Sequence, residues 1–167
     1  KTELFVLNVS EEQLMAEGAQ ALTERYAMEL RIPPSRLVVM SNKIESELAT
    51  LADEDRFAYL KELGLDRSGL DRLITAAYSS LHLQSFLTAG EKEVRAWTIK
   101  KGTVAREAAG VIHTDFERLM ISAKVASYED FVQYKGWKGV KEAGKMRTEG
   151  RDYVMNEGDV VEFLIGK

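Results

Sequence analysis

The sequence predicts two parts, an α/β segment over residues 1–83 and a small α+β domain over residues 84–167. Two short, continuously apolar runs with a helix-period stretch between them indicate the first part. Strands buried in a parallel sheet are apolar throughout and are joined by a crossover helix. Short alternating segments separated by turn residues indicate the second part. A chain of 167 residues is long enough for two such small cores.

The first part opens with a strand, a helix and a strand. The apolar run 4–7 predicts a strand that is buried on both faces of a sheet. Ser10 is expected to cap one helix over residues 11–30, which ends before the prolines at 33 and 34. The apolar run 37–40 predicts a second buried strand, parallel to the first. Since two strands do not complete a sheet, we expect Lys1 to mark a cut inside a larger α/β domain.

Residues 44–83 have a helical period. Four leucines and one phenylalanine form a first apolar stripe, which we expect to be broken at Gly64. A second stripe follows Ser68, which is expected to cap its helix. This helical pair continues the α/β segment.

The second part is predicted to consist of short strands around one helix. An alternating strand at 93–100 is followed by a turn at Gly102 and a helix at 105–112. Further strands are predicted at 121–125 and 153–155. A turn at 156–159 precedes the last strand, at 160–165. A hairpin, a helix and further strands make an α+β roll of the ubiquitin-like, β-grasp type.

Composition excludes several classes of site. The chain has no cysteine, which rules out disulfides, thiol nucleophiles and iron–sulfur sites. No apolar run approaches the roughly 20 residues that span a bilayer, and the start does not resemble a signal peptide. We therefore expect a cytoplasmic protein without a membrane partner. Residues 84–167 contain 14 basic and 13 acidic side chains, against 9 and 14 in residues 1–83. The second part is thus the better candidate for a polyanionic partner, although a solvated mixed-charge surface also explains the balance.

Polar residues follow both predicted strands. Asn8 and Glu11 come after the first strand, and residues 41–43 (Ser-Asn-Lys) come after the second. Open α/β sheets bind ligands at the carboxyl ends of their strands, so these side chains are expected to face one crevice. Taken alone, the first pattern is explained more simply by helix capping. Two strand ends directed at one crevice favour a ligand site.

Motifs along nearly the whole chain resemble those of the YchF-type (Obg-like) P-loop ATPases. Asn8-Val9-Ser10-Glu11 is similar to the NxxE base-recognition motif of that family. Residues 41–45 are similar to its SAK-type motif, with Asn42 in place of the usual small residue. Residues 63–74 and 86–99 are also typical of the family. Residues 109–117 resemble the signature of its TGS domain, which residues 157–160 close. Leu119 and Met120 stand where the family usually has Gly-Phe.

The resemblance implies a division of labour along the chain. Residues 1–83 would be the C-terminal edge of the P-loop nucleotide-binding domain with its helical extension, and residues 84–167 a TGS domain. The intact protein would bind and slowly hydrolyse ATP, or GTP, with Mg²⁺. It would associate with ribosomes, ribosomal RNA or a protein partner through the TGS domain. The nucleotide base would be contacted by Asn8, Val9 and Glu11, with Ser41 in support. In that family the glutamate of NxxE is associated with a preference for ATP over GTP.

The chain itself lacks the phosphate-binding motif G-x-x-x-x-G-K-[ST]. Without a phosphate loop and its Mg²⁺ ligands, we expect no catalytic residue, no metal site and no bound cofactor in this chain alone. His113 is expected to be a structural turn residue. Lys100, Lys101 and Arg106 form the best basic cluster and are candidate RNA contacts; a solvated turn is the alternative.

Two function classes stay open at this point. One is a nucleotide-switch ATPase in truncated form. The other is an interaction module, in which the TGS domain binds RNA or protein without nucleotide chemistry. A stand-alone enzyme that also contains a TGS domain, such as an aminoacyl-tRNA synthetase or a stringent-response nucleotide synthetase, is not supported, because its catalytic motifs are missing.

Overall fold

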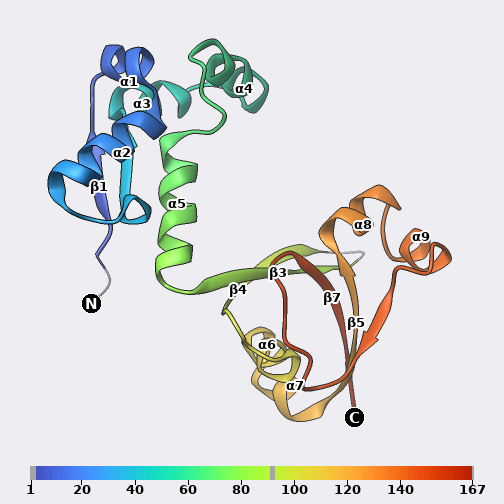
Figure 1. Cartoon of the computed structure of the whole chain (residues 1–167). Coiled ribbons are helices and arrows are strands. Elements are labelled where there is room, and N and C mark those ends of the chain that lie inside the picture. Colours follow the sequence, from blue (N-terminus) through green and yellow to red (C-terminus); the bar gives the residue numbers. More distant parts are fainter. Residues whose placement is uncertain (1–2, 91–92, 167) are drawn as a thin grey trace. The chain divides into compact units, whose positions relative to one another are not determined.

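The computed structural model describes residues 3–90 and 93–166. The chain forms two compact units, residues 1–81 (unit 1) and residues 82–167 (unit 2) (Figure 1). Lys1, at the predicted cut, and Glu91 and Lys92, within the family-typical run 86–99, lie outside the described residues. No helix in the described ranges is both long enough and apolar enough to span a bilayer.

Unit 1 contains the predicted pair of parallel strands. Strand β1 (Phe5–Asn8) pairs with β2 (Leu37–Met40), with Asn8 opposite Met40 at the carboxyl ends. The connection contains helix α1 (Glu11–Glu17), helix α2 (Ala19–Leu30) and the short 3₁₀ helix η1 (Pro34–Arg36). Ser10 caps α1 as predicted, because its Oγ accepts a hydrogen bond from the Gln13 amide at 3.2 Å. The prediction of one continuous helix to residue 30 is wrong, since Gly18 adopts a positive φ of 79° and separates α1 from α2.

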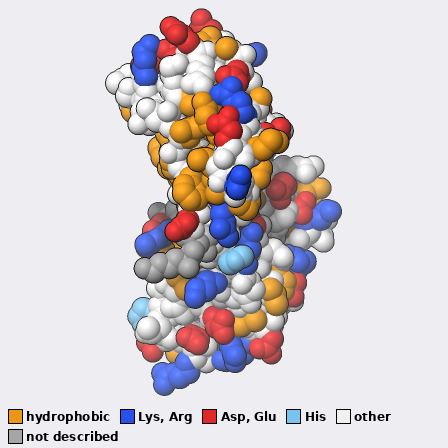
Figure 2. All heavy atoms as spheres, turned by 60° about the vertical axis from the view of Figure 1, so that its left-hand side comes forward, with side chains coloured by type: hydrophobic (Ala, Val, Ile, Leu, Met, Phe, Trp, Pro, Cys, Tyr) orange, Lys and Arg blue, Asp and Glu red, His pale blue; other side chains and the backbone are white. Residues whose placement is uncertain are grey.

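The two strands differ in burial. All four residues of β2 are buried, as predicted. The prediction for β1 is wrong, because Phe5 is 39% and Val6 49% exposed. Among the described residues β1 pairs only with β2, so one of its edges and part of its surface stay uncovered. Hydrophobic side chains accordingly appear on the surface of unit 1 (Figure 2).

The rest of unit 1 is helical. Helix α3 (Asn42–Leu48) follows β2, and α4 (Asp53–Glu62) and α5 (Gly69–Ser80) come next. The apolar stripe that was predicted to break only at Gly64 is already interrupted between α3 and α4, and Phe57 is 71% exposed. Three acidic residues in the first turn of α4 favour a new helix start at that point. Ser68 caps α5 as predicted, accepting from the Asp71 amide at 3.0 Å.

Helix α5 is fastened to the end of β2 by two polar side chains. The Glu45 carboxylate accepts hydrogen bonds from the amides of Gly69 (2.6 Å) and Leu70 (3.2 Å), at the N-terminus of α5. Arg72 of α5 donates from Nη2 to the carbonyl of Val39 at 3.0 Å. The Arg72 guanidinium therefore provides a hydrogen-bond donor for a carbonyl on the edge of β2 that does not pair with β1. Burial lowers the pKa of Arg72, although Glu45 opposes that shift.

Unit 2 is a five-stranded mixed sheet of order β4-β3-β7-β5-β6. Its strands are β3 (Leu83–Ala89), β4 (Val94–Lys100), β5 (Met120–Ser127), β6 (Arg147–Glu149) and β7 (Asp159–Ile165). The first and last strands of the unit, β3 and β7, lie side by side in parallel, and all other neighbours are antiparallel. The strand predicted at 93–100 is confirmed from Val94, and the last strand begins at Asp159, one residue earlier than predicted.

Two helices cover one face of this sheet (Figure 1). They are α6 (Ala105–Ile112), with the bounds that the sequence predicts, and α7 (Thr114–Leu119). Three alanines of α6 pack without exposed surface against Phe86, Val125 and Val161 of the sheet. Two further short helices, α8 (Tyr128–Gln133) and α9 (Trp137–Glu142), connect β5 to β6.

The segment 153–155 is not the strand that the sequence predicts. Only Val154 forms an isolated bridge, to Val104. The Tyr153 carbonyl accepts from the Ala105 amide at 2.8 Å, and the Met155 amide donates to the Thr103 carbonyl at 3.0 Å. These backbone groups therefore bond to the residues at the start of α6 and not to a neighbouring strand.

A buried carboxylate organises the turn before β7. Asp159 is 3% exposed and accepts from the Tyr153 hydroxyl (2.9 Å), the Asn156 amide (2.9 Å) and Arg147 Nη2 (3.3 Å). The Arg147 guanidinium also donates to the Tyr153 hydroxyl at 3.1 Å. The Asp159 side chain of β7 thus connects to β6 through Arg147 and to the turn through Tyr153 and Asn156.

Candidate functional site

The carboxyl ends of β1 and β2 bring the predicted polar residues to one edge of unit 1. The backbone continues the pairing beyond the strands, because the Val9 amide donates to the Met40 carbonyl at 2.9 Å. The chain then turns into α1 on one side and into α3 on the other. Asn8, Val9 and Glu11 come from the first connection, and Ser41 to Lys43 from the second. We call these six residues the strand-end site.

Asn8 joins the two connections directly. Its Oδ1 accepts a hydrogen bond from the Asn42 amide at 2.9 Å, across 34 positions of sequence. This is the loop-tying role that an asparagine at a strand end can perform. The Asn8 side chain is held by its oxygen, and its Nδ2 group donates no hydrogen bond to the described residues.

Glu11 and Lys43 form a salt bridge across the same edge. Lys43 Nζ lies 2.5 Å from Glu11 Oε2, and the side chains are 67% and 26% exposed respectively. The hydrogen bond to Glu11 raises the pKa of Lys43, and the charges of Glu11 and Glu47 add to the rise. The salt bridge therefore lies at the rim of the site, where solvent also reaches Lys43.

Ser41 and Val9 are buried residues of the strand-end site. Val9 is 8% and Ser41 1% exposed, and Ser41 Oγ has no hydrogen-bond partner among the described residues. Leaving a buried hydroxyl without a partner costs about 1–3 kcal/mol. The structure thus brings Asn8, Val9, Glu11 and Ser41 to one edge, and their contact with a nucleotide stays a prediction.

Sequence reasoning missed the residues that support this edge from behind. Gly69 approaches the end of β2 so closely that a Cβ there would lie 2.5 Å from Met40 Cβ and 2.8 Å from Glu45 Oε1. Glu45 and Arg72 hold α5 against this point. The sequence signals were two family motifs, residues 41–45 with Glu45 and residues 63–74 with Gly69, and they do not reveal which residues touch.

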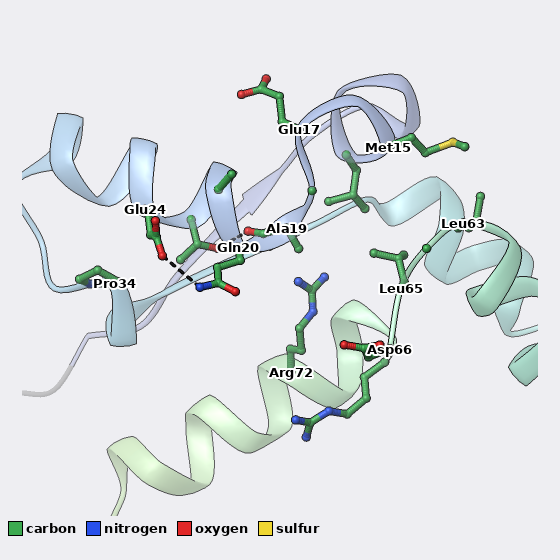
Figure 3. A pocket seen from close by; sticks show the side chains of 16 residues that line it. Met15, Glu17, Ala19, Gln20, Glu24, Pro34, Leu63, Leu65, Asp66 and Arg72 are labelled. Atoms are coloured by element: carbon green, nitrogen blue, oxygen red, sulfur yellow. Dashed lines mark hydrogen bonds between the residues drawn. The ribbon is translucent and has the colours of Figure 1, made fainter.

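Unit 1 also contains a wide hollow of about 920 Å³ (Figure 3). Arg72 points into it from α5, opposite Ala19 and Gln20 of α2, and Leu65 lies beside it. Gln20 donates a hydrogen bond to Glu24 at 3.1 Å along its wall. Its lining mixes apolar side chains with charges of both signs, and Arg72 already donates to Val39. Arg72 Nε is buried without a hydrogen-bond partner among the described residues, but the mixed lining does not indicate one class of ligand.

The described residues offer neither a phosphate loop nor a metal site. Within residues 3–90 and 93–166, no group of three or more His, Asp or Glu side chains could hold a metal ion. One segment comes close to the phosphate-loop spacing, because Gly139, Gly144 and Lys145 match G-x-x-x-x-G-K. Met146 follows where the motif needs Ser or Thr, and the segment begins inside α9. There Gly139 packs against the Tyr134 carbonyl, so no open loop forms.

The basic residues proposed from the sequence do not form one cleft. Lys100, Lys101 and Arg106 are all exposed, at the end of β4 and the first turn of α6. Arg106 lines a small cleft of about 220 Å³ together with Thr114, Glu117, Arg118 and Arg151. The two lysines do not line it. His113 lies at the turn between α6 and α7 and accepts a hydrogen bond from the Asp115 amide, at 3.2 Å, through Nδ1.

The chain is similar to proteins of one family. A family model described as "YchF-GTPase_C: Protein of unknown function (DUF933)" matches residues 83–166. The "Ribosome-binding ATPase YchF" of Bacillus subtilis is 46% identical over 163 residues, which are 98% of this chain and 44% of the relative. Human "Obg-like ATPase 1" is 40% identical over 164 residues, 98% of this chain and 41% of the relative.

Solved structures agree with these relatives. The structure of the Schizosaccharomyces pombe YchF GTPase superposes with a TM-score of 0.79 at 34% identity, covering 96% of this chain and 43% of that one. A GTP-binding protein from Pyrococcus horikoshii, at 15% identity and a TM-score of 0.56, shares the fold. The chain spans less than half the length of the curated relatives it matches.

The family model covers the whole sheet and helices of unit 2, and the curated relatives extend the likeness through the strand-end site. The chain belongs to the YchF family of Obg-like ATPases.

Proposed function

We propose that this chain is the base-recognising and TGS-containing part of a ribosome-associated ATPase that prefers ATP to GTP. The observation that supports this most strongly is the convergence of Asn8, Glu11 and residues 41–43 at the carboxyl ends of two parallel strands. Ligands of open α/β sheets bind at this edge. The relatives named as ribosome-binding or Obg-like ATPases support the assignment.

The carboxylate of Glu11 sets the base preference in this proposal. An aspartate at this motif position accepts two hydrogen bonds from guanine, through its N1 and N2 groups. Glu11 is one methylene longer, which displaces the carboxylate and disrupts that paired geometry. Adenine presents an N6 donor beside an N1 acceptor. Its recognition therefore does not require a carboxylate that accepts two hydrogen bonds. With the carboxylate displaced, the paired hydrogen bonds to guanine are lost. A base that leaves buried hydrogen-bonding groups unpaired binds more weakly, so guanine becomes the disfavoured base.

Unit 2 is, in this proposal, a TGS domain of the β-grasp type. Parallel first and last strands at the centre of a five-stranded mixed sheet, with helices on one face, support that classification. The unit would contact ribosomal RNA or a ribosomal protein partner in the cytoplasm, with Lys100, Lys101 and Arg106 as RNA contacts. Their exposure and their position at one strand end and helix start support this role.

Nucleotide hydrolysis would require groups outside the described residues. Phosphate binding and Mg²⁺ coordination need a glycine-rich loop with its Lys-Ser/Thr ending. In this proposal the strand-end site contacts the base of a nucleotide, and the described residues contain neither a phosphate loop nor a group of three metal-ligating side chains.

The second candidate is an interaction module without nucleotide chemistry. The completeness of the unit 2 core favours it, since this core does not depend on unit 1 residues. In that case the residues of the strand-end site would have only structural roles, at the start of α1 and in the hydrogen bond between Asn8 and Asn42.

Glu11→Asp distinguishes the two candidates. In a longer protein that joins this chain to a phosphate-binding loop, the substitution is expected to shift the ATP/GTP affinity ratio towards GTP by about tenfold or more. The gain stays below the roughly 10⁴-fold of a fully built hydrogen-bonding site, because Asn42 and Val9 still surround the base. Competition between labelled ATP and GTP measures the ratio.

Glu12→Asp is the matched control. Glu12 is the next residue of the same helical turn and is exposed. It should leave the ratio unchanged. If Glu11→Asp also leaves it unchanged, Glu11 is a helix-start residue and the base-recognition role is wrong.

A further inference from the structure

The cleft between α6, α7 and the segment that precedes Tyr153 is unusually rich in arginine. It has a volume of about 220 Å³, and its five lining residues are Arg106, Thr114, Glu117, Arg118 and Arg151. None of the five is hydrophobic. Protein–protein hot spots combine arginine with buried aromatic residues, and no aromatic residue lines this cleft. Guanidinium groups, in contrast, match the oxygen geometry of phosphate.

Arg151 is held in a fixed position. Its Nη1 donates to the carbonyls of Arg118 (3.1 Å) and Met120 (3.1 Å), and its Nη2 to the carbonyl of Glu117 (3.2 Å). All three acceptors are neutral carbonyls at the end of α7, and no carboxylate lies within ion-pair distance of Arg151 in the described part of the chain. Its positive charge is therefore fixed at the cleft and not neutralised by an acid.

Arg106 and Arg118 supply charges that are free to engage a ligand. The Arg106 amide donates to the Arg151 carbonyl at 3.1 Å, which places the first turn of α6 against the Arg151 segment. Among the described residues the Arg106 side chain has no hydrogen bond or ion pair. Arg118 is 78% exposed and forms an exposed ion pair with Asp115 at 3.9 Å. Such a pair contributes little to folding, so Arg118 can exchange it for a phosphate oxygen.

Glu117 is the only acid that lines the cleft, and it leans on α6. A Cβ built on Gly110 would lie 3.0 Å from Glu117 Oε2 and 3.1 Å from its Cβ, so this side chain packs over the glycine. Three positive groups and one negative group leave the cleft with a net charge of about +2. An exposed site of this charge attracts phosphate oxygens through both Coulomb attraction and paired hydrogen bonds.

We propose that the cleft of Arg106, Arg118 and Arg151 binds the phosphodiester backbone of RNA. This proposal rests on the proposed ribosome association, and it identifies the cleft as the surface that contacts ribosomal RNA. Arg106 was a sequence-based candidate, but its partners in the cleft are the two arginines, and not Lys100 and Lys101. Arg151 is a fixed charge, Arg106 and Arg118 pair with phosphate oxygens, and the Thr114 hydroxyl is a further donor.

The test is salt-dependent binding of a fluorescein-labelled hairpin RNA to the 167-residue chain, followed by fluorescence anisotropy. The variant is Arg106→Gln with Arg118→Gln. Arg151 is left intact because it holds the end of α7. Each phosphate contact contributes about 0.7–0.9 to the slope of log affinity against log salt concentration. Loss of two contacts should therefore flatten this slope by about 1.5 and weaken binding about 30-fold at about 0.1 M salt.

Lys138→Gln with Lys141→Gln is the matched control, since both lysines are exposed on α9 and have no ion pair in the described part of the chain. It should change affinity less than threefold. Thermal unfolding of both variants should match the unmodified chain, because exposed charges contribute little to stability. A DNA hairpin of the same sequence should bind through the same two arginines, since phosphate is the shared chemistry.

The outcomes separate the two proposals. If the chain binds the RNA but the arginine variant keeps its affinity and salt slope, the cleft is not the contact, while ribosome association can stand. If the unmodified chain binds neither the hairpin nor intact ribosomes, the proposed ribosome association itself is wrong. Equal losses in the arginine and lysine variants would show a diffuse charge effect and would overturn the cleft.

Discussion

Replacing Asp159 by alanine is expected to lower the unfolding free energy of unit 2 by about 3–4 kcal/mol. The carboxylate is 3% exposed and accepts from the Tyr153 hydroxyl, the Asn156 amide and Arg147. Removing it leaves three donors without their acceptor, and hydrogen bonds to a charged group contribute about 1.5–3 kcal/mol each without being additive. Both tryptophans belong to unit 2, so denaturant unfolding followed by tryptophan fluorescence measures the loss.

Asp152→Ala is the control for this experiment, because Asp152 is an exposed acid seven residues away with no hydrogen bond or ion pair in the described ranges. It should cost less than about 0.5 kcal/mol. A pH series adds an independent readout. Burial raises the pKa of Tyr153, and the hydrogen bond to Asp159 raises it further.

A raised tyrosine pKa stabilises the folded state below the unfolded pKa of about 10 and loses that contribution as pH rises through the folded pKa. Asp159→Ala should therefore weaken the alkaline dependence as well as the stability at neutral pH. Equal stability of the Asp159 and Asp152 variants would show that the network does not hold the turn.

Gly69→Ala is expected to destabilise unit 1 by about 2–4 kcal/mol. The new Cβ would meet Met40 Cβ at 2.5 Å and Glu45 Oε1 at 2.8 Å, so α5 must shift away from the end of β2. The shift also breaks the hydrogen bonds that the Gly69 and Leu70 amides donate to the Glu45 carboxylate. Amide hydrogen exchange at Leu37–Met40 should accelerate by about thirtyfold or more, at about 1.4 kcal/mol per factor of ten.

Gly150→Ala is the matched control, since nothing lies within 4 Å of its added Cβ and its φ is not positive. It should leave exchange in β2 unchanged. Unchanged exchange in the Gly69 variant would mean that α5 is not fastened at this point, and the strand-end site would lose its support from behind.

The sequence predicted elements best where local chemistry decides them. Ser10 and Ser68 cap helices as expected, and α6 has the predicted bounds, because capping hydroxyls and helical periodicity act over a few residues. The convergence of Asn8 and Asn42 was also foreseeable, since parallel strands end at the same edge.

One error arose at a local backbone turn, and the others arose where tertiary contacts decide the structure. Gly18 divides the first helix although the apolar period continues through it. Residues 153–155 have the composition of a strand, but their backbone groups bond to the start of α6. Arg118 and Arg151 lie 33 positions apart, so no linear pattern shows that they join Arg106 in a cleft. Burial of β1 was predicted from its apolar run alone, and the described residues do not supply the neighbours that this burial requires.

The base-recognition role of the strand-end site is tested most directly by titrating the 167-residue chain with nucleotides while amide chemical shifts are followed by NMR. ATP should shift amides at residues 8–12 and 41–43, with a dissociation constant in the millimolar range or weaker, about −4 kcal/mol. Adenosine should bind within about threefold of ATP, because the described residues have no phosphate loop. Shifts confined to other residues, or micromolar binding that depends on the triphosphate, would contradict the assignment.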